Sequence, residues 1–597
     1  MQRDTIVDRL ISNGLRLTYR PALWFERDDG TWRAVSWRAY VRRARWFAGA
    51  LISVGYQPGD CVAIIGNNSV EWLIADVGAM VARAVPAGIY QTSTVEQLAY
   101  IASHCSAKVI VVEDEAAYDK VFAARDRLPD LERIVMIRGA ERISDELVIG
   151  FEDFCQLGAE LGGAVDERIA SIEPGDLATL IYTSGTTGPP KGVMLSASNL
   201  AETASIAVEI IGRDANLDDS VVSYLPLSHI AEQMFSIHVA ITSGYACFIC
   251  PQLDKLKDTL VAGRPTYFLG VPRVWEKFHA ALEQKLGEAS GLKAAIVKWS
   301  REVGLEVGRA RLAGKPVSRI DEIKYQIADR LFFSKLKSQL GLDRLKVAVT
   351  GAAPISLEVL EFFLSCGIVI YEVYGQSEGS GPTTFNRPEP GGTKLGSAGL
   401  PMPRCEVKLG EDGEIMLRGP NVFMGYFRNE QATAETLRDG WLCSGDIGTF
   451  DEDGFLRITD RKKDLLITAG GKNIAPQNIE KLLKSIDGVS QAVVIGDKRK
   501  YLAALLTLDP VAAPALAQKQ GWPGELDVLA GHDGFRTHVQ REVDRVNQGL
   551  ARYETIKKWV LLPEDFTIES GELTPTQKIK RKVVYEKHHE AIEGMYG

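Results

Sequence analysis

The chain lacks the features that mark a membrane-spanning or an exported protein. It contains no run of eighteen apolar residues, so no transmembrane helix is expected. Its first five residues do not combine positive charge with a following apolar core, so no secretory signal is expected. Its eight cysteines are scattered over 597 residues rather than spaced as a disulfide framework. These absences predict a reducing, cytoplasmic compartment, and they leave peripheral contact with a membrane open.

The chain also lacks the excess of basic residues and the metal-ligand spacing that two other classes of protein need. Its net charge of −9 argues against a dedicated nucleic-acid binder. Cys247 and Cys250 form a Cys-x-x-Cys pair inside an apolar run, but no second Cys or His pair lies beside it at zinc spacing. We therefore expect two core cysteines on a strand rather than a metal or redox site.

What is present is enough apolar sequence for a large core. Hydrophobic residues make up 45% of the chain and charged residues 25%, which is ordinary for a soluble globular protein. A chain of 597 residues is too long for one compact domain, so two or three domains are expected. Apolar, β-branched segments alternate with helical ones, which predicts parallel sheets with helical crossovers. We expect buried strands at 61–66, 107–112, 347–350 and 369–371, and helices at 70–81 and 95–102.

The pattern changes in the last third of the chain. Past Arg404, short strands with Asp-Gly turns predict an antiparallel, barrel-like subdomain. Five consecutive charged residues at 460–464 then indicate an exposed hinge, or simply a solvated turn. The sequence beyond them predicts a small α+β domain, with a helix at 479–485 and strands at 493–495 and 502–508. The fold class is therefore α/β: a large N-terminal domain of stacked sheets and the barrel-like subdomain (1–460), a hinge (461–463) and a C-terminal domain (464–597).

One stretch differs from the rest in charge. Between Lys277 and Lys346 there are fifteen basic and eight acidic residues, a net of +7 in a chain of −9. Its periodic apolar positions, among them Ile323, Ile327 and Leu331, predict amphipathic helices. Such helices could present a basic surface to an anionic membrane or to the phosphates of a cofactor. We favour an ordinary solvated helical face, because basic and acidic residues are mixed.

The most informative segment, residues 182–192, follows a predicted buried strand at 177–181. It holds three glycines, four hydroxyl side chains and a lysine. Such a loop lets backbone N–H groups approach a polyphosphate, while the hydroxyls and the lysine add donors and charge. It is not the common phosphate loop, because Lys191 is followed by Gly192. A polar surface loop would rarely pack four hydroxyls between three glycines.

This segment closely resembles the signature of the adenylate-forming superfamily, which includes acyl-CoA synthetases, luciferases and the adenylation domains of peptide synthetases. The resemblance implies that a carboxylate attacks the α-phosphate of ATP with Mg²⁺ present, and that CoA then displaces AMP. It assigns a magnesium contact to Thr186. It assigns the grip on the outgoing pyrophosphate to Thr183, Ser184, Gly185, Thr187, Gly188 and Lys191.

A second string, residues 374–378, resembles the superfamily's Y-G-x-T-E motif. By this resemblance Glu378 is the magnesium carboxylate and Tyr374 stacks on adenine, while Ser377 keeps the hydroxyl of the usual Thr. One carboxylate suffices for magnesium, which prefers waters and phosphate oxygens as its other ligands. A Tyr-Gly turn with a surface Glu is the plain alternative. In this part of the chain, the resemblance assigns nucleotide binding to Gly351, Ala352, Ala353, Glu372, Tyr374, Gly375 and Ser377.

The resemblance places the ribose grip and the reacting carboxylate elsewhere in the chain. Asp446 and Arg461 would bind the ribose hydroxyls, although an Asp after Gly is also a common turn residue. His229, in a string similar to one that lines the family's acyl pocket, would be a pocket wall and gate at the catalytic centre. A lone His beside apolar residues is more often a core histidine.

The C-terminal part resembles the family's mobile lid. Lys578 matches the catalytic lysine, although Gln577 replaces the usual Gly and the register could favour Lys580. A lysine there can neutralise charge as the carboxylate joins the α-phosphate. Lys463 matches the residue about which the family hinges. Gly470, Gly471 and Lys472 match the loop that forms the CoA thiol tunnel after the lid rotates.

Residues 269–277, with a helical insertion at about 278–344, resemble the long-chain and very-long-chain branch of the acyl-CoA synthetases. The implied activity is a fatty acid–CoA ligase that forms an acyl-adenylate. Two alternatives stay open. The adenylate of an acyl or aryl acid could pass to a carrier-protein thiol, or the chain could be a binding homologue without turnover. The presence of Glu378 and Lys578 disfavours the latter.

Overall fold

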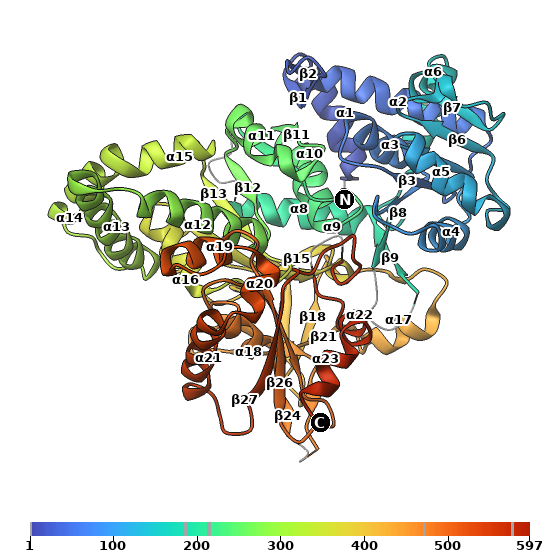
Figure 1. The fold of residues 1–597 in the computed structure, drawn as a ribbon. Coiled ribbons are helices and arrows are strands. Elements are labelled where there is room, and N and C mark those ends of the chain that lie inside the picture. Colours follow the sequence, from blue (N-terminus) through green and yellow to red (C-terminus); the bar gives the residue numbers. More distant parts are fainter. Residues whose placement is uncertain (1–2, 184–188, 212–216, 463, 470–471, 575–577) are drawn as a thin grey trace.

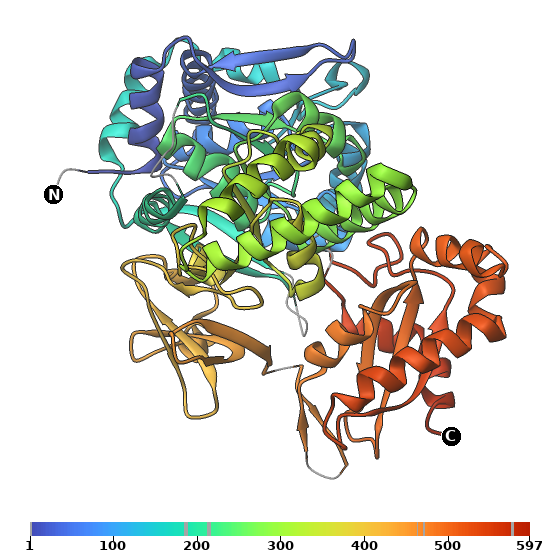
Figure 2. The same cartoon turned by 90° about the vertical axis from the view of Figure 1, so that its left-hand side faces the viewer.

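A computed structural model gives the arrangement of the chain. It describes residues 3–183, 189–211, 217–462, 464–469, 472–574 and 578–597. Figure 1 shows the N-terminal half (blue to green) above the C-terminal domain (orange and red), and Figure 2 shows that domain as a separate lobe beside the antiparallel sheet. Among the described residues, none of the helices is both long enough and apolar enough to cross a bilayer.

The N-terminal half is built on a mixed eight-stranded sheet in the order β19-β9-β8-β4-β3-β5-β6-β7. The predicted parallel pairing is confirmed from β8 to β7, whereas β9 and β19 run antiparallel at one edge. The strands are β3 (Cys61–Ile65), β4 (Val85–Ile89), β5 (Val109–Val112), β6 (Arg133–Met136), β7 (Val148–Gly150), β8 (Leu177–Thr183), β9 (Lys191–Ser196) and β19 (Gly425–Tyr426). Its helices are α1 (Ile6–Arg16), α2 (Trp37–Ser53), α3 (Val70–Val81), α4 (Val95–His104), α5 (Glu115–Ala124), α6 (Phe151–Leu157), α7 (Gly162–Ser171) and α8 (Ala197–Ile211).

Two smaller sheets continue this body. One has the order β10-β11-β1-β2 and the other β12-β13-β14-β15-β16. Cys247 lies on β11 and Cys250 just after it, and both are buried, as expected of core cysteines. The strands are β1 (Pro21–Glu26), β2 (Trp32–Ser36), β10 (Ser220–Ser223), β11 (Ala246–Ile249), β12 (Tyr267–Leu269), β13 (Val347–Thr350), β14 (Ile370–Gln376), β15 (Gly381–Phe385) and β16 (Leu400–Pro401). The helices are α9 (Ile230–Gln233), the π-helix η3 (Met234–His238), α10 (Val239–Ser243), α11 (Leu256–Gly263) and α16 (Leu357–Ser365).

The basic stretch forms a helical insertion at the left of Figure 1. It consists of α12 (Pro272–Gly287), α13 (Gly291–Leu312), α14 (Arg319–Ala328), the π-helix η5 (Asp329–Phe333) and α15 (Ser334–Leu340). Val303 and Val307 of α13 are buried, as the apolar periodicity predicts. Ile323, Ile327 and Leu331, by contrast, lie on the surface.

The rest of the chain forms two units. The first is an antiparallel sheet of β17 (Glu406–Leu409), β18 (Glu414–Arg418), β20 (Leu437–Arg438), β21 (Trp441–Phe450) and β22 (Leu456–Arg461), with α17 (Glu430–Thr436). The second is the α+β C-terminal domain. Its strands are β23 (Leu466–Ile467), β24 (Asn473–Ile474), β25 (Val489–Ile495), β26 (Leu502–Leu508) and β27 (Ile556–Leu562). Its helices are α18 (Pro476–Leu483), α19 (Ala512–Gln520), α20 (Leu526–Gly531), α21 (Asp533–Gln548), α22 (Arg581–Lys587) and α23 (His589–Gly594).

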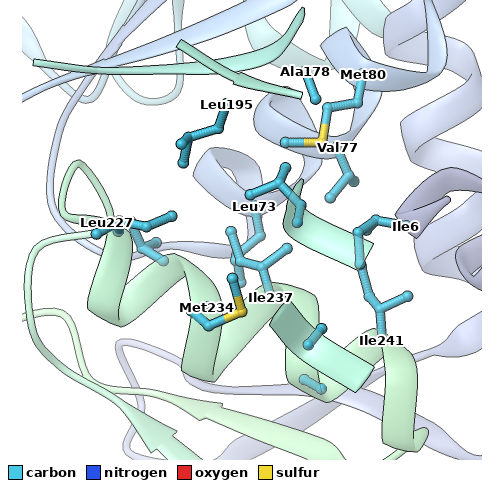
Figure 3. Packing of buried hydrophobic residues seen from close by; sticks show 14 of the residues in the cluster. Ile6, Leu73, Val77, Met80, Ala178, Leu195, Leu227, Met234, Ile237 and Ile241 are labelled. Carbon is cyan, nitrogen blue, oxygen red and sulfur yellow. The ribbon is translucent and has the colours of Figure 1, made fainter. Parts of the chain in front are cut away.

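The largest core cluster lies between the helices and the strands of the body. Figure 3 shows side chains of α1 and α3, among them Ile6 and Leu73, close to Met234 and Ile237 of η3. Helix α3 is apolar on nearly all sides, as suits a helix buried between layers. Met234 also lines the cavity described below, so the same packing that stabilises the body fixes part of the cavity wall.

One buried carboxyl in this core generates a stability prediction. Asp76 of α3 is fully buried, and neither of its oxygens has a hydrogen-bond partner among the described residues. Burial raises its pKa from 3.8 to about 8. Because the folded pKa lies above the unfolded value, folding takes up a proton, and stability falls as the pH rises from about 4 to about 8.

The non-titrating variant Asp76→Asn should therefore gain stability relative to the wild type as the pH rises. We expect the difference in melting temperature, variant minus wild type, to grow between pH 5 and pH 8. Thermal unfolding of both proteins across that range measures it. A difference that stays constant with pH would contradict the shifted pKa.

Candidate active site

A cavity of about 2440 Å³ lies between the body, the antiparallel sheet and the C-terminal domain. Its walls include the ends of β8 and β9, the loop before α9, strands β13 and β14, the ends of β21 and β22, and residues 578–583. It brings together most of the described residues that the sequence singled out: Thr183, Lys191, His229, Gly351, Ala352, Ala353, Glu372, Tyr374, Gly375, Ser377, Glu378, Asp446, Arg461 and Lys578.

Several predicted residues are not in this group. The rest of the phosphate loop (Ser184, Gly185, Thr186, Thr187 and Gly188), Lys463, Gly470 and Gly471 lie outside the described residues. Lys472 is exposed, does not line the cavity, and has its ammonium 5.8 Å from the ring centroid of Tyr553. Its role in a CoA tunnel after a domain rotation stays a prediction.

Asp446 is a buried carboxylate at the cavity wall that links three strands. It is buried on β21 and accepts a hydrogen bond of 2.8 Å from Tyr374 Oη and one of 2.9 Å from Arg461 Nε. Tyr374 belongs to β14 and Arg461 ends β22, so the carboxylate joins two sheets and the strand that leads to the C-terminal domain. Its two oxygens are therefore held in a fixed direction at the cavity wall.

Close backbone packing explains why a glycine occupies position 375 in the 374–378 string. A Cβ added at Gly375 would lie 1.7 Å from the carbonyl oxygen of Gly381, so any side chain would force β14 and β15 apart. Gly351 is similarly tight, because its Cβ would lie 2.8 Å from the carbonyl oxygen of Val373. These close approaches keep the strand ends compact where Tyr374 and Ser377 line the cavity.

Glu378 and Lys191, the lysine at the end of the predicted phosphate loop, contact the same tyrosine. Tyr426 Oη donates a hydrogen bond of 2.7 Å to Glu378 Oε1, and the Lys191 ammonium lies 4.6 Å from the centroid of the same Tyr426 ring. Tyr426 belongs to β19, which pairs with β9 at Val193 and Met194. Sequence reasoning missed Tyr426, because nothing in its local sequence signals a contact made through sheet pairing with a distant strand.

These residues fit a magnesium–phosphate site. Glu378 offers one half-buried carboxylate at the cavity wall, and the positive charge of Lys191 lies on the same cavity wall, where it would suit phosphate oxygens. Magnesium needs few protein carboxylates when phosphate oxygens and waters complete its octahedron. No group of three or more His, Cys, Asp or Glu side chains suited to a metal occurs among the described residues.

Lys578 and His229 both line the cavity, and the charge of Lys578 acts on His229. Burial lowers the pKa of Lys578 to about 8, with the charge of Arg461 acting in the same direction and those of Asp446 and Glu378 opposing it. Burial, helped by the Lys578 charge, lowers the pKa of His229 to about 3. The imidazole is therefore neutral near pH 7. Its Nδ1 accepts a hydrogen bond of 3.1 Å from the N–H of Ala231, which leaves the proton on Nε2.

Glu372 and the C-terminal domain also meet at the cavity. The Gly396 N–H donates to Glu372 Oε2 at 2.7 Å, and burial raises the pKa of this carboxyl to about 8. Lys481 of α18 is among the charges that oppose this shift. Lys481 was not predicted from the sequence, because a single Lys on an amphipathic helix carries no signal of its neighbour.

Arg273 joins the N-terminal body to the C-terminal domain. Its Nη2 donates to Ser490 Oγ at 2.8 Å and to Asp565 Oδ2 at 3.1 Å. One turn along α12, Glu276 Oε1 lies 3.8 Å from Lys484 Nζ. The string at 269–277 therefore contributes to the docking of the C-terminal domain, a role that its sequence alone does not reveal.

Comparison with known proteins places these features in a family. The protein-family model named AMP-binding enzyme matches residues 16–427 of the sequence. The family model named AMP-binding enzyme C-terminal domain matches residues 463–597. Long-chain-fatty-acid–CoA ligase ACSBG2 of Xenopus laevis is 39% identical over 95% of this chain and 80% of its own length. Long-chain-fatty-acid–CoA ligase FadD15 of Mycobacterium bovis is 36% identical over 95% of this chain and 93% of its own length.

Solved structures share the fold at lower identity. The anthranilate CoA ligase AuaEII in complex with anthranoyl-AMP has a TM-score of 0.73 at 20% identity, over 99% of this chain and 98% of its own. The A domain of a carboxylic acid reductase from Segniliparus rugosus, in complex with AMP, has a TM-score of 0.75 at 20% identity, over 100% and 94%. The superfamily resemblance is thus confirmed: the chain belongs to the AMP-binding enzyme family, with both its main domain and its C-terminal domain.

Proposed function

We propose that the chain is an ATP-dependent long-chain fatty acid–CoA ligase. In the first step, a carboxylate oxygen of the acid bonds to the α-phosphorus of ATP, and the bond to pyrophosphate breaks. In the second, the thiol sulfur of CoA bonds to the acyl carbon, AMP leaves and the thiol proton is released. The observation that carries the proposal is the single cavity in which Asp446, Glu378 and Lys578 meet.

The nucleotide would be held by the segments around Tyr374 and Asp446. The Asp446 carboxylate has a fixed direction through Tyr374 and Arg461, and a carboxylate accepts paired hydroxyl hydrogen bonds from a ribose well. Tyr374, Gly375 and the 351–353 segment form the adjoining wall, where a flat adenine would lie. Thr183 and Lys191 mark the side for the outer phosphates.

Charge at the reacting centre would come from Lys578. The charges of Arg461, Asp446 and Glu378 act on its ammonium, and the lysine in turn acts on His229. These groups would surround the proposed α-phosphate position. Negative charge builds up there as the carboxylate attacks, and a prearranged cation stabilises it. His229 is neutral and would serve as a wall of the acyl entry, not as an acid or base.

Glu378 and Thr186 would hold magnesium together with the phosphates of ATP. When bound, the ion supplies Lewis-acid stabilisation of the phosphate charge. Tyr426 fixes the Glu378 carboxylate through its hydroxyl.

The second step would use the joint between the two parts of the chain. We place the joint at 461–463, between a main domain of 1–460 and a lid of 464–597. The ionic contacts of Arg273 and Glu276 hold the lid in the arrangement that brings Lys578 to the cavity. A lid rotation about Lys463 would withdraw Lys578 and bring the Gly470–Gly471–Lys472 loop to the site as the CoA tunnel.

The substrate class is supported by the relatives, which are named long-chain-fatty-acid–CoA ligases at 36–39% identity. Pyrophosphate release, assayed with fatty acids of graded length, with CoA and with a carrier protein as acceptors, tests the proposal. We expect turnover with long acids and with CoA. Transfer to the carrier thiol alone, or preference for an aromatic acid, would favour the alternative ligases, and no pyrophosphate with any acid would overturn adenylation.

The Asp446→Asn variant tests the ribose grip. It keeps the shape and removes the charge, so charge-assisted hydrogen bonds worth about 1.5–3 kcal/mol are weakened. We expect the KM for ATP to rise about tenfold or more, with less effect on the KM for the fatty acid. Glu406→Gln is the control, because Glu406 is an exposed carboxylate paired with Arg418 in the same antiparallel sheet. An unchanged KM for ATP in a folded Asp446→Asn variant would exclude this role.

The variants Lys578→Ala and Lys580→Ala form a matched pair for the lysine. We expect Lys578→Ala to slow ATP–pyrophosphate exchange by about 10²–10³, the range for loss of one electrostatic contact to a transition state. Conversion of supplied acyl-adenylate to acyl-CoA should change much less. Lys580→Ala should retain most of the exchange activity. The reverse pattern would move the assignment to Lys580.

The lowered pKa of Lys578 predicts an alkaline limit. Since the ammonium loses its proton as the pH rises through about 8, kcat/KM for adenylation should fall above that pH. Lys578→Arg keeps its charge to a much higher pH, so its residual activity should lack this alkaline limb. A profile of pyrophosphate release between pH 6 and pH 10 compares the two proteins. The same alkaline limb in both would assign it to another group.

A further inference from the structure

The helical insertion carries an apolar stripe that does not pack against the rest of the chain. Its members are Ile320, Ile323 and Ile327 of α14 and Leu331 of η5, which are 67%, 57%, 45% and 42% exposed. Their spacing of three or four residues places them on one face of a continuous helical segment. The opposite face, with Ala328, Phe332, Phe333 and Leu336, is buried in the second core cluster. The stripe is therefore additional to the residues that fold this segment.

The charges around the stripe are positive on balance, although the exposed carboxylate of Glu306, on the neighbouring helix α13, acts on Lys324. The acidic side chains of α14 and η5 are all engaged: Asp321 with Lys324, Glu322 with Arg311, and Asp329 with Lys337. The exposed basic side chains next to them form no ion pair with any described residue. These are Lys315, Arg319, Arg330 and Lys335. The sequence favoured an ordinary solvated face because basic and acidic residues are mixed along it. In the structure, however, the basic side chains beside the stripe outnumber the acidic ones that have no ion-pair partner.

We propose that this face, the α14 stripe with its flanking basic side chains, docks on an anionic lipid surface. An amphipathic helix with exposed isoleucines and flanking Arg and Lys binds the interface of a bilayer through apolar insertion and through attraction to acidic headgroups. Helix α14 lies at the outer edge of the insertion in Figure 1, and none of the stripe's residues lines the large cavity. A helix at the outer edge of the molecule can reach a planar lipid surface.

A second copy of the chain is a poorer occupant. A two-fold interface places the same patch of both copies together, so Arg319 and Arg330 of one chain would face those of the other. Like charges brought together across an interface oppose association. An anionic bilayer has the complementary charge.

Docking would also place the insertion helix α12, which lines the cavity, in the part of the chain next to the bilayer. If the substrate is a fatty acid, as proposed above, it dissolves in the bilayer, so docking would bring the cavity close to the substrate. The lipid contact itself does not rest on the proposed function, and vesicle binding can be measured without turnover.

The experiment is co-sedimentation of the full chain with vesicles of phosphatidylcholine alone and of phosphatidylcholine with phosphatidylglycerol. We expect binding to the anionic vesicles that weakens as the salt concentration rises. The double variant Ile323→Glu/Ile327→Glu should lower the partition coefficient about tenfold or more, because each change removes apolar contact and adds repulsion. Arg319→Gln/Arg330→Gln should lower binding to the anionic vesicles selectively.

The matched control is Leu157→Glu, at a 50% exposed leucine of α6 on the other side of the molecule in Figure 1. It should bind vesicles like the wild type, and all variants should keep the wild-type melting temperature, since the changed side chains are exposed. Absence of binding to the anionic vesicles, or equal binding by the Ile323→Glu/Ile327→Glu variant, would overturn the proposal. A dimer in light scattering that this variant dissolves would instead identify a second copy as the occupant and would also overturn it.

Discussion

The site depends on one buried carboxylate. Asp446 takes hydrogen bonds from Tyr374 and Arg461, and these three side chains come from strands of the body sheet and of the antiparallel sheet. A buried charge is tolerable only where its partners are in place, so this contact fixes the two sheets relative to each other. It also fixes the last residue of β22, from which the C-terminal domain starts. The carboxylate proposed to bind the ribose of the nucleotide therefore also holds the strand from which the C-terminal domain starts.

The docked position of the C-terminal domain also determines the charges around Lys578 and His229. Lys578 can reach its place only because the C-terminal domain is docked, and Arg273 and Glu276 of α12 supply contacts for that docking. Once there, Lys578 has a pKa lowered by burial and by the charge of Arg461, although Asp446 and Glu378 oppose the shift, and its own charge helps keep His229 neutral. Further anionic groups, such as phosphate and carboxylate, would favour the charged form of this lysine.

In the helical insertion, periodic apolar residues are buried in one helix and exposed in another. In α13 the periodic valines are buried, whereas in α14 the periodic isoleucines remain in solvent. Both patterns look alike as sequence, because amphipathicity indicates a face without naming what covers it. The distinction arises from which side of the helix the neighbouring core cluster occupies.

The sequence by itself determined the family, the α/β class and most element positions, because backbone-dominated motifs such as 182–192 and 374–378 encode local structure and chemistry together. Most of the described residues that it singled out as site candidates line one cavity. Only the tertiary structure decided what these residues touch. The pairing of β19 with β9 brings Tyr426 to Glu378, and the docked domain brings Lys481 to Glu372. Such contacts join residues far apart in the chain, and a local pattern carries no information on its distant partner. The antiparallel strands β9 and β19, at one edge of the predicted parallel sheet, were not foreseen for the same reason.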